Sequence, residues 1–260
     1  MILEIRAASL EIDGRAVLRD LSFSVEEGER VVVLGVNGCG KTTLLKLLDG
    51  LVFATGGEIR YGGSPVHARA LDDAAFRRRF RGEVAFLFQN VDAMLFNPTV
   101  ADEIAFGPRQ LGLADVEGRV DRWARTLGVT SLLARPPFDL SGGEKKRVAL
   151  AALLACDPRV LLLDEATANL DPAWAGRLVD LLAVRRDLTV VSATHNLSVA
   201  EEMGKRALLL PPGGGGLLFD GPTAGLMRDP LLLVRSGLAH RHVHTHDGTD
   251  HAHFHVHDVE

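Results

Sequence analysis

The sequence lacks most features that mark secreted or membrane-spanning proteins. Among its 260 residues are two cysteines, Cys39 and Cys156, too few for a disulfide framework and typical of a reducing compartment. The longest apolar run, Val148–Cys156, is half the length of the ~18 residues that a membrane-spanning helix needs, so no span is expected. The first residues include Glu4 and Glu11 and form no charged-then-apolar leader, so no signal peptide is expected.

Positive charge is also scarce. The net charge is −5, and only five of the 29 basic residues are lysine. This balance argues against a protein that binds by neutralising phosphates over a broad surface, so we expect no nucleic-acid partner. Hydrophobic residues at 47% and charged residues at 24% are globular proportions, with enough chain for one large domain or two modest ones.

Two apolar patterns predict the fold. In the first 25 residues apolar and polar residues alternate, as in Leu21–Val25, which predicts half-buried antiparallel strands joined by an Asp13-Gly14 turn. After residue 30 the apolar runs are short and continuous, which is typical of parallel strands buried on both faces beneath helices. These runs are Val31–Leu34, Val84–Phe88, Val160–Leu163 and Thr189–Val191.

A residue with useful chemistry follows each of these runs: Gly35, Gln89, Asp164 and His195. In open α/β sheets, ligands bind outside the carboxyl ends of the strands. We therefore expect these four residues to converge on one site.

The chain divides into a domain of residues 1–238 and a tail of residues 239–260. Between Gln89 and Leu140 the sequence predicts helices interrupted by Gly and Pro, including Gly107 and Pro108, as an inserted helical subdomain of about residues 90–157. Leu217–Asp220 is a candidate edge strand. The tail holds eight of the ten histidines and has the composition of a flexible, low-complexity segment.

A phosphate-binding loop is the strongest motif. Gly35–Thr42 fits G-x-x-x-x-G-K-[ST] and lies between a predicted strand and the predicted helix Thr43–Leu48. In such a loop backbone N–H groups surround the phosphates, the lysine reaches the β- and γ-phosphates, and the hydroxyl after it ligates Mg²⁺. The alternative, a glycine-rich turn with a chance lysine, does not explain the strand–loop–helix context. The predicted nucleotide-binding residues of the loop are Gly35, Asn37, Gly38, Cys39, Gly40, Lys41, Thr42 and Thr43.

Two acids follow the run Val160–Leu163. A lone acid after a buried strand is usually a turn residue, but beside a phosphate loop Mg²⁺ and a hydrolytic water both need carboxylates. We assign Asp164 to Mg²⁺ and Glu165 to the attacking water as a general base.

The segment Leu140–Glu144 has two explanations. Ser141 and Glu144 fit an S-x-x-E capping box at the start of a helix through Lys145–Cys156. The same helix N-terminus, with the amides after Ser141, can instead bind an anion. This helix end lies about 100 residues from Lys41 on an inserted subdomain, so a second copy of the chain is one way to bring it to the same nucleotide.

Together these segments resemble the ATP-binding cassette (ABC) ATPases over residues 2–235, in the family's order and spacing. The matching segments are Gly35–Thr42 (phosphate loop), Gln89 (Q-loop), Leu140–Glu144 (signature), Val160–Glu165 (Walker B), Ala168–Asp171 (D-loop) and His195 (switch histidine). The resemblance implies a P-loop NTPase (RecA-like) fold of α/β class, with a parallel-sheet core, an N-terminal antiparallel β subdomain and an inserted helical subdomain.

The resemblance also implies an ATPase coupled to membrane transport that uses ATP and Mg²⁺. Two cassettes, as a homodimer or a heterodimer with a related chain, would pair head to tail with ATP between the phosphate loop of one and the signature of the other. Asp171 would communicate across that interface. By the same resemblance the catalytic residues would be Lys41, Gln89, Glu165 and His195, the Mg²⁺ ligands Thr42, Gln89 and Asp164, and the signature contacts Ser141, Gly142, Gly143 and Glu144.

Three further segments resemble the energy-coupling factor subgroup, especially its cobalt and nickel members: Phe88–Asn90, Leu95–Val100 and Ala105–Pro108. That implies a transmembrane coupling protein and a substrate-capturing membrane protein as partners, with this chain peripheral on the cytoplasmic face. The sequence departs from the family at Ile12, where an aromatic residue usually stacks on adenine.

The histidines of the tail alternate with other residues. Neutral imidazole suits Ni²⁺, Co²⁺ and Zn²⁺, so the tail is a candidate transition-metal binder, although a solvated tail or a purification tag is the alternative. Other functions left open are import of another micronutrient, a soluble non-transport ABC protein with a metal-buffering tail, and a metal store or sensor. The candidate ligands are His240, His242, His244, His246, His251, His253, His255 and His257.

Overall fold

The computed structural model describes residues 1–246 and 249–256, and from residue 240 onward it describes the backbone alone. The chain forms two compact units. The first contains Met1–Ala68 and the chain from Val190 onward, and the second contains Arg69–Thr189. None of the helices in this described part is long and apolar enough to cross a membrane.

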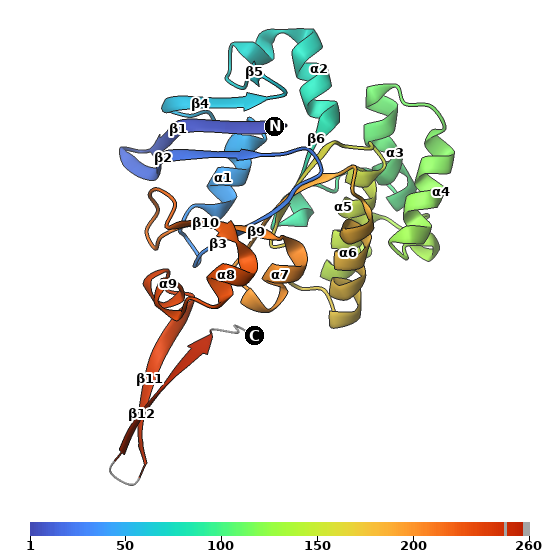
Figure 1. Cartoon of the computed structure of the whole chain (residues 1–260). Coiled ribbons are helices and arrows are strands. Elements are labelled where there is room, and N and C mark those ends of the chain that lie inside the picture. Colours follow the sequence, from blue (N-terminus) through green and yellow to red (C-terminus); the bar gives the residue numbers. More distant parts are fainter. Residues whose placement is uncertain (247–248, 257–260) are drawn as a thin grey trace. The chain divides into compact units, whose positions relative to one another are not determined.

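The first unit begins with an antiparallel sheet in the order β2-β1-β4-β5 (Figure 1). The predicted hairpin is confirmed, because Ile12 pairs with Arg15 around a turn in which Asp13 and Gly14 have φ of 50° and 74°. Burial alternates in each half of β1, as expected of a half-buried strand, and shifts by one residue at Arg6 and Ala7, where the register is irregular. The strands are β1 (Leu3–Ile12), β2 (Arg15–Val25), β4 (Gly56–Tyr61) and β5 (Ser64–Pro65).

A parallel ladder forms the core of the first unit. β3 (Arg30–Leu34) pairs in parallel with β8 (Thr189–Thr194) and with β9 (Arg206–Leu209). Because both faces of β3 are covered, its apolar run is continuous rather than alternating. Beyond β9, β10 (Phe219–Pro222) pairs antiparallel, two residues later than the expected edge strand. The helices of this unit are α1 (Lys41–Leu48), α7 (Ala200–Met203), α8 (Thr223–Met227), α9 (Pro230–Arg235) and the 3₁₀ turn Leu197–Val199.

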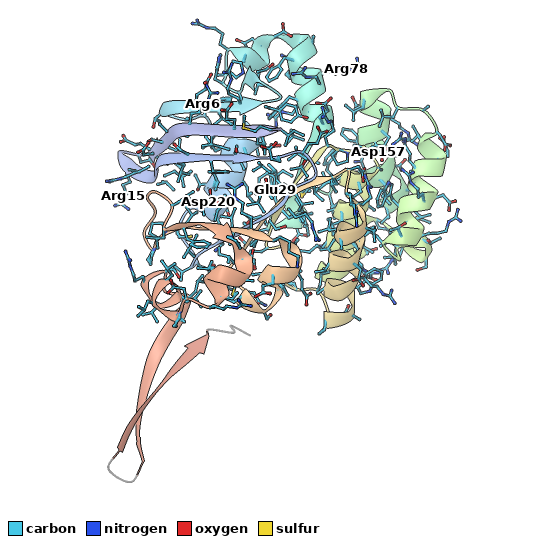
Figure 2. The ribbon with its side chains drawn as sticks, viewed as in Figure 1. Arg6, Arg15, Glu29, Arg78, Asp157 and Asp220 are labelled. Atoms are coloured by element: carbon cyan, nitrogen blue, oxygen red, sulfur yellow. The ribbon has the colours of Figure 1, made fainter. Side chains whose placement is uncertain are left out.

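One arginine, Arg206 of β9, forms ion pairs with two acids outside that strand. The Arg206 guanidinium donates to the two carboxylate oxygens of Asp220 at 2.5 and 2.7 Å and to Glu29 at 3.2 Å. Both carboxylates raise the pKa of Arg206, so the guanidinium stays charged. Figure 2 labels Glu29 and Asp220, the two acids that Arg206 bridges.

The second unit combines two parallel strands with most of the longer helices. β6 (Val84–Leu87) pairs with β7 (Val160–Asp164), and α3 and α4 pack against α5 (Figure 1). The helices are α2 (Ala74–Glu83), α3 (Val100–Leu111), α4 (Val116–Thr126), α5 (Gly142–Leu154) and α6 (Pro172–Val184). The 3₁₀ turns are Ala70–Asp72, Val91–Ala93, Thr130–Leu132 and Pro137–Asp139.

The prediction that Gly107 and Pro108 interrupt a helix is wrong. Both residues lie inside α3, which ends only at Gly112, a C-cap with φ 69°. Gly107 serves packing instead, because a Cβ there would collide with the Cys156 sulfur. The small residue lets two helical segments approach closely.

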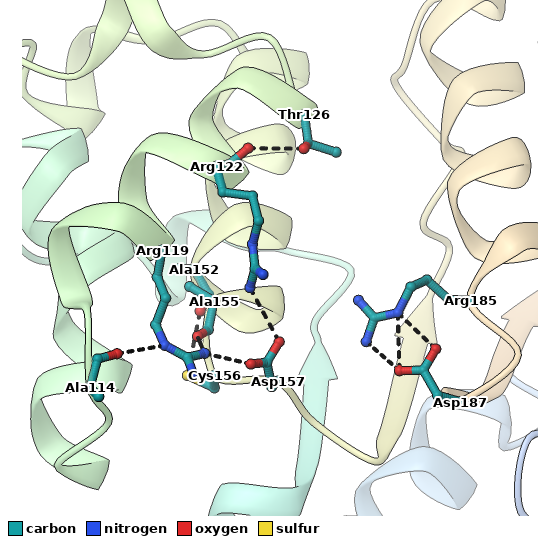
Figure 3. Close-up of polar contacts among 10 residues, drawn as sticks. All are labelled: Ala114, Arg119, Arg122, Thr126, Ala152, Ala155, Cys156, Asp157, Arg185 and Asp187. Atoms are coloured by element: carbon teal, nitrogen blue, oxygen red, sulfur yellow. Dashed lines mark hydrogen bonds and ion pairs between the residues drawn. The ribbon is translucent and has the colours of Figure 1, made fainter.

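Arginines of α4 hold the C-terminal end of α5 in place. The Arg119 guanidinium donates to the Ala155 carbonyl at 2.9 Å and to the Asp157 carboxylate at 2.6 Å, and Arg122 also reaches Asp157, at 3.5 Å (Figure 3). The Ala155 bond satisfies a carbonyl that the end of the helix leaves without an intrahelical partner. These contacts fix α5, the helix that begins after Ser141.

The tail, for which the sequence predicted no secondary structure, has a regular backbone. β11 (Ala239–His246) and β12 (Thr249–Val256) form an antiparallel hairpin. Leu238 and Ala239, at its base, are buried in the core of the first unit.

Candidate functional site

The phosphate loop connects β3 to α1 in the first unit. Gly35, Gly38 and Gly40 have φ of 152°, 80° and 104°, a region that residues with a Cβ rarely adopt. A Cβ on Gly35 would lie 2.5 Å from the Cys39 sulfur and 3.1 Å from the Leu210 carbonyl oxygen. Glycine is therefore required at the start of the loop by both conformation and space.

Lys41 lies across this loop. Its side chain is 6% exposed, and its ammonium donates to the Gly35 carbonyl at 2.7 Å and to the Val36 carbonyl at 3.3 Å. Asn37 and Gly38 are exposed, and a Cβ on Gly38 would meet no atom within 4 Å. The loop thus encloses a cation and leaves its rim open, an arrangement that fits a triphosphate.

Cys39 is the inward-facing residue of the loop. Its side chain is completely buried and lies beside Gly35. Thr42 and Thr43 are half-buried in the first turn of α1, directly after Lys41.

The structure places His195 at the same sheet edge as the phosphate loop. In the parallel register of β3 and β8, Leu34 pairs with Thr194, so Gly35 and His195 leave the sheet at neighbouring strand ends. His195 is half-buried. Two of the four residues expected to converge are therefore brought together in the first unit.

The other two are brought together in the second unit. Leu87 pairs with Leu163 in the parallel register of β6 and β7, so Gln89 and Asp164 follow neighbouring strand ends. Asp164 is 1% exposed and Glu165 is buried after it, whereas Gln89 is exposed. The meeting of this pair with Gly35 and His195 stays a prediction.

The donor set fits magnesium bound together with a nucleotide. Within the part of the chain that the structure describes, no group of three or more His, Cys, Asp or Glu side chains is arranged to hold a metal ion. Mg²⁺ rarely uses an all-protein cage and is usually held by one or two carboxylates and by substrate phosphates. Asp164 in the second unit and the Thr42 hydroxyl in the first are hard oxygen donors of this kind, and their binding of a common ion stays a prediction.

Sequence reasoning missed Lys146. This lysine of α5 is 2% exposed and donates to the carbonyls of Glu165 at 2.8 Å and Ala168 at 2.5 Å. Burial lowers the pKa of Lys146, while the Glu165 and Asp164 carboxylates act in the opposite direction. Two signals were available in the sequence. Lys146 is the second of two consecutive lysines in a lysine-poor chain, and it shares a helix face with Leu150, four residues later, which is buried.

The predicted capping box at the start of α5 is confirmed. Glu144 accepts from the Ser141 backbone N–H and hydroxyl, both at 2.8 Å, and its own N–H donates to the Ser141 oxygen at 3.4 Å. These hydrogen bonds lower the pKa of Glu144. Ser141 and Gly142 are exposed, so the cap does not exclude a ligand at this helix end.

Asp171 has a structural role of its own. It is the N-cap of α6, and its carboxylate accepts from the Trp174 N–H at 3.0 Å. The guanidinium groups of Arg147 and Arg177 stack on the Trp174 ring, 4.4 and 4.7 Å from its centroid. Arg147 belongs to α5, so that helix also contacts the segment after Asp171.

The candidate metal ligands of the tail lie on the hairpin. In its register His240 pairs with His255, His242 with His253, and His244 with His251, while His246 pairs with Thr249. His257 lies outside the described residues.

Comparison with known proteins gives one family model and many relatives. The model of the ABC transporter family matches residues 18–168. The nickel import ATP-binding protein NikO of Rhodobacter capsulatus is 39% identical, over 90% of this chain and 94% of that protein. The energy-coupling factor transporter ATP-binding protein EcfA of Methanothermobacter thermautotrophicus is 38% identical, over 87% and 72%.

Solved structures agree with this likeness. CbiO1 of Clostridium perfringens, part of the ABC transporter complex CbiONQ, superposes with a TM-score of 0.76 at 27% identity, over 91% of this chain and 94% of that one. The cassette MJ0796, a dimer in a post-hydrolysis state with ADP and Pi, gives a TM-score of 0.76 at 23% identity and supports the fold alone. The predicted α/β fold is confirmed.

Proposed function

The chain belongs to the ABC transporter family of ATP-binding proteins, and from this premise we propose that it energises the import of a transition-metal ion, nickel or cobalt. It is an ATPase coupled to transport, and it uses ATP with Mg²⁺. The choice of cargo rests on one observation. This chain is 39% identical to a nickel import protein, and its own tail has histidines at alternate positions.

The proposed hydrolytic site combines residues that follow β3, β6, β7 and β8. The amides of the phosphate loop and the Lys41 ammonium bind the phosphates, and His195 contacts the γ-phosphate. Mg²⁺, when bound by Thr42, Gln89 and Asp164, supplies positive charge to the phosphate oxygens. Glu165 orients the attacking water and accepts its proton. Phosphoryl transfer depends mainly on such positioning and charge stabilisation.

We propose that two copies pair head to tail, although a heterodimer with a related cassette has the same geometry. The exposed start of α5, with Ser141–Glu144, would face the triphosphate held by Lys41 of the other copy. Asp171 would lie at the interface, where its cap of α6 keeps the segment rigid.

Complementation tests the pairing. Lys41→Ala and Ser141→Gly homodimers should each be nearly inactive, because both of their composite sites lack one component. In a mixture with random pairing, half of the dimers contain one intact site, so roughly a quarter of the wild-type activity should return. If the mixture is as inactive as its components, the two residues serve one site within a single chain.

A groove in the second unit is the proposed contact for a transmembrane coupling protein. Its volume is about 240 Å³, and the exposed aromatics Phe96 (66%) and Phe138 (78%) line it. Phe96 also packs edge-to-face on Phe106, 5.0 Å between centroids. Exposed aromatic side chains beside a groove are typical of an interface. This contact would hold the protein peripherally on the cytoplasmic face of the membrane.

Substitution of these aromatics tests the contact. Phe96→Ser and Phe138→Ser should reduce co-purification with the co-expressed membrane components and leave the basal ATPase unchanged. Leu231→Ser, at an equally exposed residue of the first unit (70%), is the matched control. Equal recovery of the membrane components with all three variants would refute the assignment of this groove.

We further propose that the tail binds Ni²⁺, Co²⁺ or Zn²⁺. Residues i and i+2 of a strand share a face, so the described histidines of β11 and β12 occupy one face of the hairpin. Opposed residues have Cβ atoms about 4.5–5.5 Å apart, close enough for two imidazoles to ligate one ion. A site of this kind would capture or buffer the cargo.

The register makes this proposal testable. The protein lacking residues 240–260 should show no Ni²⁺ binding by the tail in calorimetry. Its basal ATPase activity, measured separately, should be unchanged. The opposed pair His242→Ala and His253→Ala should be strongly non-additive in Ni²⁺ affinity, whereas His240→Ala and His251→Ala, in different opposed pairs, should be nearly additive. Unchanged Ni²⁺ binding after deletion would exclude the tail.

The decisive experiment for the cargo is transport. The chain, reconstituted in proteoliposomes with its co-expressed membrane components, should drive ATP-dependent uptake of Ni²⁺ or Co²⁺, and Glu165→Gln should abolish it. ATPase activity without uptake of either ion favours the second candidate, an importer of another micronutrient, for which the similarity to EcfA is the supporting observation.

A further inference from the structure

The turn after β7 has an unusual backbone. Glu165 has φ 49° and Asn169 has φ 63°, the left-handed region that residues with a Cβ seldom occupy. Within it the Ala168 N–H donates to the Glu165 carbonyl at 3.1 Å, and the Leu170 N–H donates to the Thr167 carbonyl at 3.3 Å. Such conformations persist where the surrounding structure holds them.

Lys146 is the side chain that holds this turn. Its ammonium donates to both ends of the turn, to the Glu165 carbonyl at 2.8 Å and the Ala168 carbonyl at 2.5 Å. A buried lysine without compensating bonds is costly, and here the two carbonyls and the nearby Asp164 and Glu165 carboxylates compensate it. The ammonium therefore contacts the backbone of Glu165, the residue assigned to the attacking water.

The lysine also connects this turn to α5, the helix that begins in the signature segment Leu140–Glu144. Lys146 lies five residues after Ser141, within the second turn of α5. A helix is stiff over this length, so a displacement of its N-terminus moves the Lys146 ammonium with it.

We propose that Lys146 is a positioning residue for ATP hydrolysis: its two hydrogen bonds fix the Glu165–Ala168 turn, aim the Glu165 carboxylate at the attacking water, and connect that carboxylate to the signature helix. The inference rests on the proposed role of Glu165 and is independent of the cargo.

Three variants separate positioning from folding. Lys146→Met keeps an unbranched side chain, one atom shorter than lysine and matched in length to glutamine, and removes every donor. Lys146→Gln is one atom shorter, carries no charge and retains two N–H donors. Val148→Ala, at a completely buried residue two positions further along α5 and so on a different face of the helix, creates a cavity.

The steady-state ATPase of the full chain, measured against ATP concentration, gives the answer. Lys146→Met should lower kcat by about 10- to 100-fold with KM for ATP nearly unchanged, because a ~1 Å misplacement of a catalytic group can cost a hundredfold. Lys146→Gln should recover most of kcat. Val148→Ala should lower Tm and keep the wild-type kcat at 25 °C. Lys146→Leu replaces the Met variant if the latter does not fold.

The outcomes are distinct. A Met variant with wild-type kcat, a Gln variant no better than the Met variant, or a Val148→Ala variant that loses as much kcat overturns the inference. Glu165→Gln measured alongside shows where a failure lies. If that variant still turns over, the proposed role of Glu165 fails, and if it is inactive while Lys146→Met is active, the inference about Lys146 alone fails.

Discussion

The two explanations of Ser141, helix cap and ligand of a triphosphate, predict different results for Ser141→Gly. The substitution removes the hydroxyl that donates to Glu144 at 2.8 Å and accepts from the Glu144 N–H at 3.4 Å, and it retains the backbone bond to Glu144 at 2.8 Å. Since Gly is only a few tenths of a kcal/mol worse than Ser at an N-cap, the loss of folding free energy should be about 1 kcal/mol or less. For a chain of this size that lowers Tm by roughly 2–4 °C.

The expected effect on hydrolysis is much larger. A hydrogen bond to a charged group contributes about 1.5–3 kcal/mol, so loss of one bond to the γ-phosphate should reduce kcat/KM by roughly 10- to 150-fold. Thr99→Gly is the matched control, because the Thr99 hydroxyl caps α3 in the same way, accepting from the Asp102 N–H at 3.1 Å and donating to its carboxylate at 2.7 Å. Thermal unfolding and steady-state ATPase are measured on both variants. The ligand role of Ser141 is refuted if both variants lose stability and activity to the same small extent.

Three further predictions concern single residues. Glu165→Gln should bind ATP and accumulate as an ATP-bound dimer in size-exclusion chromatography; rapid turnover would contradict its assignment to the attacking water. Ile12→Tyr, at an exposed position at the end of β1, should tighten ATP binding about fivefold in calorimetry, since aromatic stacking contributes ~1 kcal/mol; unchanged affinity would count against adenine stacking there. Cys39 is buried, and burial raises the pKa of Cys156 to about 11. Neither thiol should therefore react with a disulfide reagent at pH 7, and Cys156 should become reactive only toward pH 11. Fast labelling at neutral pH would refute this.

The parts of the fold that depend on local chemistry were predictable. Asp13-Gly14 specifies the β1–β2 turn, and the continuous apolar runs identify β3, β6, β7 and β8. The strand β9 was not predicted, because Arg206–Leu209 is short and follows a helical turn, and only its pairing with β3 makes it a strand. Likewise β4 contains two glycines and two charged residues, and its conformation comes from the ladder with β1.

The candidate site shows the same division. The phosphate loop and the capping box were predictable because each is a contiguous motif whose chemistry depends on spacing. Lys146 was not, since a lysine in a Lys-Lys-Arg run is ordinarily solvated, and its burial depends on the turn that follows β7. The register of the tail hairpin was also hidden, because alternate histidines do not specify which partner each one faces.

Helix α5 connects Ser141 to the Glu165–Ala168 turn, and this connection has a measurable consequence. Its N-terminus presents Ser141, its second turn holds Glu165 through Lys146, and its C-terminal end is held by Arg119. Suppose that Ser141→Gly lowers activity partly by displacing α5 and, with it, Glu165. In that case Ser141→Gly should lower kcat/KM less in a chain that already carries Lys146→Met than in the wild type. The double variant should then retain more kcat/KM than the product of the single effects allows. Strict multiplicativity would mean that Ser141 acts by direct contact with the nucleotide alone and that α5 transmits nothing.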